Sequence, residues 1–374
     1  MELNVLITGG AGFIGSFLAD HFVRRGARVR VLDRLDPQVH PDGKPRHLAA
    51  DVELIAADVR DKDAVSSALV GVDIVIHAAA AVGVGQSLYR VQHYTSTNAV
   101  GMATLLEALI ERRQELQKLI VLTSMTGYGE GAYRRPSDGA LVRPPIRTPE
   151  DVQRYGWELR DLHSGELLEP APTPEDAALL ARNVYALSKR WQEELALSLG
   201  ELYGFPTTCL RLFNVYGPRQ SLSNPYTGVL AIFLSRILNG EAPVVYEDGR
   251  QTRDFVSVHD VVAAVQSAID TPASNGQVFN IGTGIPRRIV DVAETLARLV
   301  GRPEVQPQIT NAFRKGDIRH CFADNTRARD VLGFTPRVDW ETSLLEIAEW
   351  CASAPAVDRF HQADRELRLH GLLR

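Results

Sequence analysis

The sequence predicts an α/β protein: a Rossmann-type doubly wound parallel sheet followed by a smaller C-terminal α/β domain. Over the first 214 residues, short apolar runs alternate with longer amphipathic segments, which is the pattern of strands joined by crossover helices. A glycine-rich turn follows the first apolar run and opens the first amphipathic segment. The length of 374 residues leaves room for a second domain.

Apolar runs bounded by turn formers predict six strands, at residues 3–8, 28–32, 52–56, 73–77, 119–123 and 207–212. Helical spacing of apolar residues predicts helices at 13–25, 61–69, 98–113 and 186–202. Beyond residue 215 the pattern loosens, with helices expected near 229–238, 258–269, 290–300 and 341–351. The charged final stretch at 354–374 is expected to be either a terminal helix or a tail. We expect a dinucleotide-binding domain at 1–214 and a mainly substrate-binding domain at 215–374, with some later segments returning to the first.

Residues 130–182 interrupt this alternation with many prolines and charges. The segment is too long for an ordinary connection between a strand and a helix. We interpret it as an insertion that forms a lid, an extra subdomain or a partner contact. Its position between the strand ending near Ser124 and the helix carrying Tyr185 favours the lid.

Composition excludes several classes of function. Lys plus Arg number 41 and Asp plus Glu 46, a net charge of −5, so sequence-independent nucleic-acid binding is not expected. The three cysteines form no CxxC pair, so neither a metal site nor a disulfide framework is expected and a reducing compartment is favoured. The sequence shows no signal-peptide pattern and no long apolar span, so we expect a cytoplasmic protein without a membrane segment.

The glycine motif Thr8-Gly-Gly-Ala-Gly-Phe-Ile-Gly15 predicts a dinucleotide site. Gly9 permits a tight turn, Gly12 lets a pyrophosphate approach the backbone, and Gly15 lets the helix pack close to the strand. Asp33 ends the second strand, where a carboxylate binds ribose hydroxyls and repels a 2′-phosphate, which favours NAD over NADP. The neighbouring Arg34 could instead attract a phosphate, so both cofactors stay open at this point.

Tyr185 and Lys189 are four residues apart and share one face of the expected helix. A tyrosine pKa of about 10 is too high for a base at neutral pH, and we expect the lysine ammonium to lower it. Ser124 ends the fifth strand, at the sheet edge where ligands bind. With the glycine motif, these residues indicate oxidation of an alcohol with a nicotinamide cofactor.

On these residues the chain resembles the extended short-chain dehydrogenase/reductases that act on nucleotide sugars, and segments 212–219, 248–255 and 313–317 agree. The resemblance implies a catalytic triad of Ser124, Tyr185 and Lys189. It implies an NAD site formed by Gly9, Gly12, Phe13, Ile14, Gly15, Asp33, Asp58, Val59, Ala78, Ala79, Ala80, Asn98, Thr123, Tyr185 and Lys189. It implies contacts with a nucleotide-diphosphate sugar at Ser124, Thr126, Asn214, Val229, Tyr246, Arg253, Arg314 and Asp317. For Tyr246 a place in the core is an equal alternative.

Within this family, dehydratases carry an acidic residue just after the catalytic serine or threonine, where this chain has Met125 and Thr126. The resemblance therefore favours epimerisation at C4 through a 4-keto intermediate. Segments 35–40, 82–87, 221–228 and 313–324 are most similar to the dTDP-L-rhamnose 4-epimerase group. The alternatives are a UDP-glucose or UDP-glucuronate 4-epimerase, an NAD(P)H-dependent 4-ketoreductase and a non-enzymatic dinucleotide sensor. The resemblance also implies a homodimer through helices 98–113 and 186–202, although these faces could equally pack on the sheet.

Overall fold

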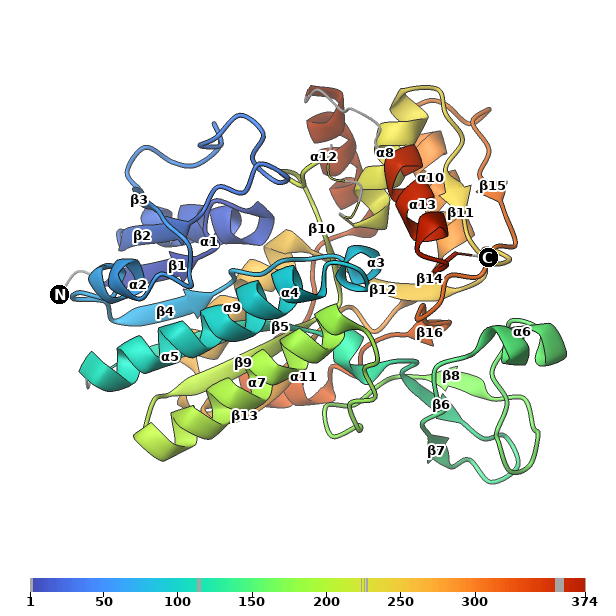
Figure 1. Cartoon of the computed structure of the whole chain (residues 1–374), viewed down its shortest axis with the longest axis horizontal. Helices are drawn as coiled ribbons and strands as arrows, with labels where there is room; N and C mark the ends of the chain where they lie inside the picture. Colours follow the sequence, from blue (N-terminus) through green and yellow to red (C-terminus); the bar gives the residue numbers. More distant parts are fainter. Residues whose placement is uncertain are drawn as a thin grey trace.

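The computed structural model describes residues 3–112, 116–222, 224, 226, 228–353 and 360–373. A seven-stranded, all-parallel sheet forms the larger part of the molecule (Figure 1), in the order β13-β9-β5-β4-β1-β2-β3. Its strands are β1 (Asn4–Thr8), β2 (Arg28–Asp33), β3 (Glu53–Ala56), β4 (Ile74–His77), β5 (Lys118–Ser124), β9 (Thr207–Leu212) and β13 (Gln277–Ile281). The chain reverses its direction of travel across the sheet between β1 and β4, the switch point where open α/β sheets bind ligands. The predicted fold class is confirmed.

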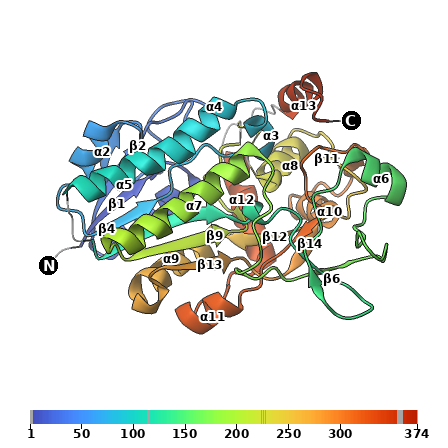
Figure 2. The ribbon, with the colours of Figure 1, turned by 60° about the horizontal axis from the view of Figure 1, so that its bottom comes forward.

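Helices cover both faces of the sheet. On one face lie α2 (Lys62–Ala68), α5 (Gly101–Arg112) and α7 (Val184–Tyr203), and on the other α1 (Phe13–Arg24), α9 (Val258–Asp270) and α11 (Thr326–Leu332). Figure 2 shows α5 and α7 on one side of the strands and α9 and α11 on the other. Because the sheet is buried on both faces, its strands are almost continuously apolar.

A smaller layer packs beside the carboxyl ends of the strands. Helices α8 (Val229–Leu238), α10 (Ile289–Leu299) and α12 (Trp340–Ser353) share one apolar core. Next to them lie β10 (Asn214–Tyr216), β12 (Thr252–Ser257), β14 (Pro286–Arg288) and β16 (His320–Cys321), and a separate pair, β11 (Val244–Val245) and β15 (Gln308–Ile309). The last described helix is α13 (Phe360–Leu369), and residues 354–359 of the predicted tail lie outside the described residues.

The insertion forms a small unit of its own, seen at the lower right of Figure 1. It holds β6 (Ala132–Arg134), β7 (Leu141–Val142), β8 (Glu169–Ala171) and α6 (Pro149–Tyr155). A capping box between Thr148 and Asp151 begins α6 after the prolines. A bridge between Thr173 and Ala323 fastens the insertion to the chain just after β16.

One element differs from its expected bounds. The helix expected at 98–113 begins earlier, with the short helices α3 (Val84–Ser87) and α4 (Val91–Tyr94) and a π-helical turn at Thr95–Val100 before α5; Arg113 lies outside the described residues. Three of the described elements after residue 215, α9, β13 and α11, belong to the layers of the large sheet. Among the described residues, no helix is long and apolar enough to cross a membrane.

Candidate active site

One cavity of about 630 Å³ lies at the carboxyl ends of the strands, between the sheet and the smaller layer. Every residue that the sequence singled out for the site lines it, except Asn98. The volume is in the range of natural ligand sites. The residues fall into three groups along the cavity: a glycine turn, a Ser–Tyr–Lys cluster and a cluster of arginines.

The glycine turn is shaped for close approach of a ligand. Gly9 has φ +70°, and a Cβ there would lie 2.7 Å from the backbone of Ala79. A Cβ at Gly15 would lie 2.3 Å from the carbonyl oxygen of Gly9, so only glycine lets α1 pack against the turn. Gly12 precedes α1 without a side chain to cap it, which leaves first-turn amides and the positive end of the helix for an anion.

Asp33, Arg34 and Asp58 form the acidic wall beside this turn. The Asp33 carboxylate accepts hydrogen bonds from the amides of Ala11 (3.1 Å) and Leu35 (2.9 Å), so it fixes the turn as well as facing the cavity. Arg34 pairs with Asp36 and lies 3.6 Å from Asp58. The guanidinium that could have attracted a 2′-phosphate is therefore already held by two carboxylates.

Asp58 is itself strongly paired. Arg60 binds both of its carboxylate oxygens, at 2.8 and 2.6 Å. These hydrogen bonds lower the pKa of Asp58 to about 2, against the opposing effect of burial. The carboxylate is therefore ionised at neutral pH, and a ligand must share it with Arg60.

Ser124, Tyr185 and Lys189 come together where β5 ends and α7 begins. The side chain of Asn183 caps α7 by accepting from the amide of Ala186 at 2.8 Å, which places Tyr185 and Lys189 in the first two turns. The Ser124 hydroxyl oxygen accepts a hydrogen bond from the Thr126 hydroxyl at 3.0 Å. All three side chains of the cluster face the same cavity.

The charges in this cluster differ from the expectation. Burial raises the pKa of Tyr185, and only a hydrogen bond with Ser124 opposes it; Lys189 does not lower it in this state. Burial also lowers the pKa of Lys189 to about 7, and its ammonium donates to the carbonyl oxygen of Leu122 at 2.6 Å. The four-residue spacing thus brings the two groups to one face, but burial weakens the cation that the prediction relied on.

Asn98 does not line the cavity. It is fully buried in the π-helical turn, where its amide accepts from the Ala81 amide (2.7 Å) and donates to the Ala81 carbonyl (3.1 Å) and to Ser188 (2.9 Å). Asn98 therefore ties the loop after β4 to α7 from behind the cavity wall. The π-helical turn that carries Asn98 was not predicted from the sequence, and in it Thr97 lines the cavity while Asn98 does not.

Arginines dominate the far end of the cavity. Asp317 pairs with Arg253 at 3.0 Å and with Arg314 at 2.8 Å. Burial raises the pKa of Asp317, but the two arginines outweigh it and hold that pKa below its usual range. The Arg314 guanidinium lies 5.7 Å from the centre of the Tyr246 ring. Because Arg314 lines the cavity, Tyr246 belongs to the cavity wall and not to a remote part of the core.

Polar atoms at this end are left for a ligand. Arg314 Nε and Asn214 Oδ1 are buried without a hydrogen-bond partner, although both residues line the cavity. Helix α8 also begins at the cavity: Gly228 precedes Val229 and offers no capping side chain. The cavity thus meets the uncapped N-termini of α1 and α8, two places suited to anions.

Several lining residues were not predicted. Phe360, Ala363 and Leu367 of α13 form an apolar part of the wall. In the same helix, the Glu366 carboxylate accepts hydrogen bonds from Tyr89 (2.6 Å) and Tyr226. The sequence does not indicate these contacts of the charged final stretch, because each tyrosine lies more than 100 residues from Glu366.

Comparisons with known proteins agree with this geometry. The family model described as "NAD dependent epimerase/dehydratase family" matches residues 5–156 and 163–282. The chain is 34% identical to a dTDP-L-rhamnose 4-epimerase of Burkholderia thailandensis over 93% of this chain and 95% of the relative. It is 30% identical to a UDP-N-acetyl-alpha-D-glucosaminuronate decarboxylase of Bacillus cytotoxicus, over 94% and 98% respectively.

A solved UDP-glucose 4-epimerase from Thermotoga maritima, in complex with UDP-glucose, superposes with a TM-score of 0.76 at 29% identity and covers 94% of this chain and 99% of that one. The resemblance inferred from the sequence is therefore confirmed. The chain belongs to the NAD dependent epimerase/dehydratase family.

Proposed function

We propose that the protein is an NAD-dependent 4-epimerase of a nucleotide-diphosphate sugar with an uncharged hexose, and dTDP-L-rhamnose is the substrate we favour. The observation that carries the proposal is the arrangement of the cavity. Ser124, Tyr185 and Lys189 line the same cavity as two uncapped helix N-termini, of which one suits the pyrophosphate of a dinucleotide and the other the diphosphate of a nucleotide sugar.

The residues at the glycine turn fit NAD. Its pyrophosphate would lie on Gly12 and the N-terminus of α1, and its adenosine ribose on Asp33. The pairing of Arg34 with Asp36 and Asp58 supports NAD rather than NADP. When bound, NAD would take a hydride from the sugar carbon and return it.

The residues of the chain would supply proton transfer and orientation. Tyr185 would accept the proton of the C4 hydroxyl and later return it, with Ser124 as hydrogen-bond partner to the same oxygen. Lys189, held on the Leu122 carbonyl, would add positive charge beside the developing phenolate. After the 4-keto sugar has turned its other face within the cavity, Tyr185 would return the proton to the C4 oxygen as the hydride is returned to C4 on that face.

The charges of the cavity support an uncharged hexose. Each arginine among the described lining residues has a carboxylate partner, Arg34 with Asp36, and Arg253 and Arg314 with Asp317. The Nε atom of Arg314 that is left for a ligand would serve the diphosphate, so the described arginines offer no further cation for the carboxylate of a hexuronate. Burial lowers the pKa of Lys189 to about 7. This argues against the substrate class named for the decarboxylase relative and against UDP-glucuronate.

We also propose a homodimer through α5 and α7. Leu187 and Trp191 on α7, and Val100 just before α5, are exposed by 48%, 45% and 50%, and a second copy would bury this strip. The homodimer predicts that Trp191→Asp shifts the mass measured by light scattering toward the monomer. The expected cytoplasmic location stays a proposal, supported by three free, buried cysteines.

The test of the function is conversion of a panel of nucleotide sugars by the protein as purified, without added NAD. The panel holds dTDP-L-rhamnose, UDP-glucose, UDP-glucuronate and a 4-keto sugar with NADH, and products are followed by anion exchange and proton NMR. We expect a C4 epimer from a neutral donor and no net NADH. Stoichiometric oxidation of NADH by the 4-keto sugar, without any epimerisation, would instead make the protein a ketoreductase.

A further inference from the structure

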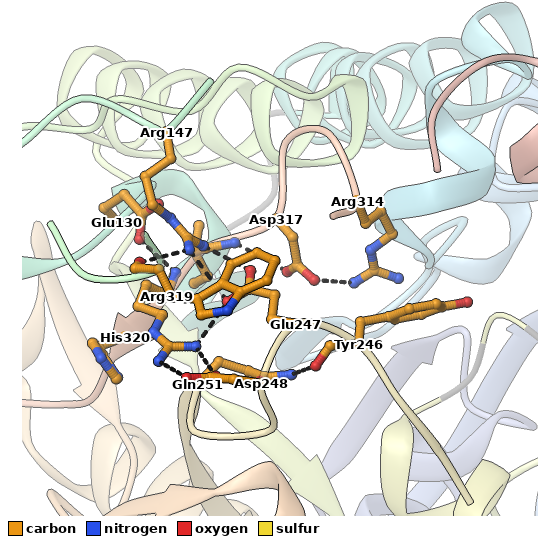
Figure 3. A network of polar contacts seen from close by, with 12 residues as sticks. Glu130, Arg147, Tyr246, Glu247, Asp248, Gln251, Arg314, Asp317, Arg319 and His320 are labelled. Carbon is orange, nitrogen blue, oxygen red and sulfur yellow. Dashed lines mark hydrogen bonds and ion pairs between the residues drawn. The ribbon is translucent and has the colours of Figure 1, made fainter. Parts of the chain in front are cut away.

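The insertion is linked to the cavity by buried side chains, which a role as a cover over the cavity does not explain. Of residues 130–182, only Ile146 lines the cavity, so this segment is not the main cover. Yet two charged side chains of the insertion are buried here: Glu130 is 1% exposed and Arg147 is 6% exposed. Both lie beside the arginine end of the cavity, as Figure 3 shows.

Arg147 holds the turn that carries Tyr246. Its guanidinium binds both carboxylate oxygens of Glu247, at 2.9 and 3.2 Å, and reaches Glu130 at 3.2 Å. Glu247 has φ +52°, a left-handed conformation that a residue other than glycine adopts at a cost. The two hydrogen bonds from Arg147 therefore stabilise a strained turn between β11 and β12. Glu247 in this turn directly follows Tyr246, whose aromatic ring faces the ligand.

Glu130 reaches the substrate-binding arginines through the backbone. Its second carboxylate oxygen accepts the amide of Arg319 at 2.5 Å. The carbonyl oxygen of Arg319 accepts from Arg253 at 3.1 Å, and Arg253 pairs with Asp317 at 3.0 Å. A continuous chain of polar contacts thus runs from the insertion to the ligand-facing cluster.

The side chain of Arg319 closes the network. It is fully buried and binds Glu247 at 2.9 Å, Asp248 at 2.7 Å and Glu158 of the insertion at 2.5 Å (Figure 3). Buried ion pairs contribute little net stability, because desolvation offsets their attraction. Their fixed geometry is the better reason for two buried arginines at this place.

We infer that Glu130 and Arg147 are positioning residues for the nucleotide end of the cavity, an inference that rests on the proposed function. Neither side chain lines the cavity. Arg147 acts through Glu247 on Tyr246, and Glu130 acts through Arg319 on Arg253. The insertion therefore sets affinity for the nucleotide and leaves the proton transfer at Tyr185 unchanged.

The test is Arg147→Lys, which keeps the charge but loses the fork. We expect KM for the nucleotide sugar, and the inhibition constants of free UDP and dTDP, to rise about tenfold, because Lys cannot replace Arg at a bidentate site. We expect kcat to change less than about twofold and the NAD content to stay the same. Arg135→Lys is the matched control, since Arg135 also pairs within the insertion, with Asp138 and Asp161.

Glu130→Gln provides a second variant should Arg147→Lys fold poorly, and it should show the same rise in KM at constant kcat. Wild-type values of KM and of the inhibition constants in both variants, with only a lower melting temperature, would overturn the inference. A fall in kcat at constant KM would overturn it as well. Turnover of the wild type is measured first, so that its absence marks a failure of the proposed function and not of the positioning role.

Discussion

The two ends of the cavity are built from different parts of the chain and by different means. At the glycine end, residues 9–15 form one continuous turn that offers backbone amides and the N-terminus of α1. At the arginine end, side chains from the insertion, from residues 246–253 and from residues 314–320 meet in a buried network. The first end is shaped by close backbone contact, the second by paired charge.

This difference determines which substitutions should disrupt each end of the cavity. An added methyl group disrupts the glycine end, because the nearest atoms are backbone and cannot move aside. The arginine end tolerates changes of size better than loss of one partner, which leaves a buried charge unpaired. Variants at one end should therefore leave ligand binding at the other end intact.

The largest effect is expected between the two ends, at Tyr185. Tyr185→Phe removes the hydroxyl that exchanges the proton and keeps the ring, so we expect kcat to fall about 10²- to 10⁴-fold. NAD content and UDP or dTDP binding should stay within about twofold, since neither end is touched. Proton NMR of the C4 epimer measures the rate; near-normal turnover would show that Tyr185 is not the base.

The next effect isolates the glycine end. In Gly15→Ala the new Cβ would lie 2.3 Å from the Gly9 carbonyl oxygen, so α1 must shift away from the turn. We expect NAD affinity to fall about a hundredfold, or about 2.7 kcal/mol, with inhibition by free UDP or dTDP unchanged. Nucleotide released from the denatured protein and calorimetric titration with NAD measure the loss.

Gly26→Asn is the matched control at the other end of α1. Gly26 has φ +78° and no atom within 4 Å of an added Cβ, and asparagine tolerates this conformation. Its NAD affinity should equal that of the wild type. Equal losses in both variants would mean that the helix as a whole, and not the turn, governs the site.

The glycine end was open to prediction from sequence because its signals are local. The apolar run before Gly9, the spacing to Gly15 and the acidic residue that ends β2 all lie within the first 33 residues, and each reflects a backbone requirement. The arginine end gave single residues, such as Arg253 and Asp317, but not their partners. Arg147 and Glu247 are 100 residues apart, and no periodicity links two such positions.

Two other features escaped prediction for physical reasons of their own. The apolar residues of α13 are sparse among charges, so the sequence left a terminal helix and a tail equally open and did not indicate that the helix lines the cavity. The pKa values of Tyr185 and Lys189 depend on burial, which the four-residue spacing does not report. The spacing thus predicted that the two side chains share one face of α7, but it did not predict how burial shifts their pKa values.

The stability of the sheet next to the glycine end should decrease in mild acid. His77 is fully buried at the end of β4, and burial, aided by Lys189, lowers its pKa to about 3. Below pH 6.5 the unfolded chain binds a proton that the folded protein does not, so the unfolding free energy falls with pH. From pH 6.5 to 5.0 the His77 share is about 2 kcal/mol, measured by urea unfolding at each pH.

The Glu158 carboxylate at the arginine end should not respond in this window, although burial also lowers the pKa of its neighbour His320. Burial raises the pKa of Glu158, but hydrogen bonds from His320 and Arg319 outweigh it and bring that pKa to about 2; its contribution is lost only as pH falls below its unfolded value. His77→Gln should therefore reduce the slope between pH 6.5 and 5.0 by the His77 share, and Glu158→Gln should not; burial also lowers the pKa of His47, to about 4, and that of His320, and these two keep part of the slope. An unchanged slope in His77→Gln would place the acid sensitivity elsewhere.

The smallest expected effect concerns α13, which lines the cavity but belongs to neither the glycine end nor the arginine end. Glu366→Gln weakens two charge-assisted hydrogen bonds from Tyr89 and Tyr226 without changing size, so we expect KM for the nucleotide sugar to rise about threefold at constant kcat. Arg365→Gln, at an exposed position of the same helix, is the control for a changed charge. Should Glu366→Gln lower kcat instead, α13 would act on the reacting sugar and not only on retention. Such a result would break the division of the cavity into a backbone end and a charged end, because a third element would then shape the chemistry between them.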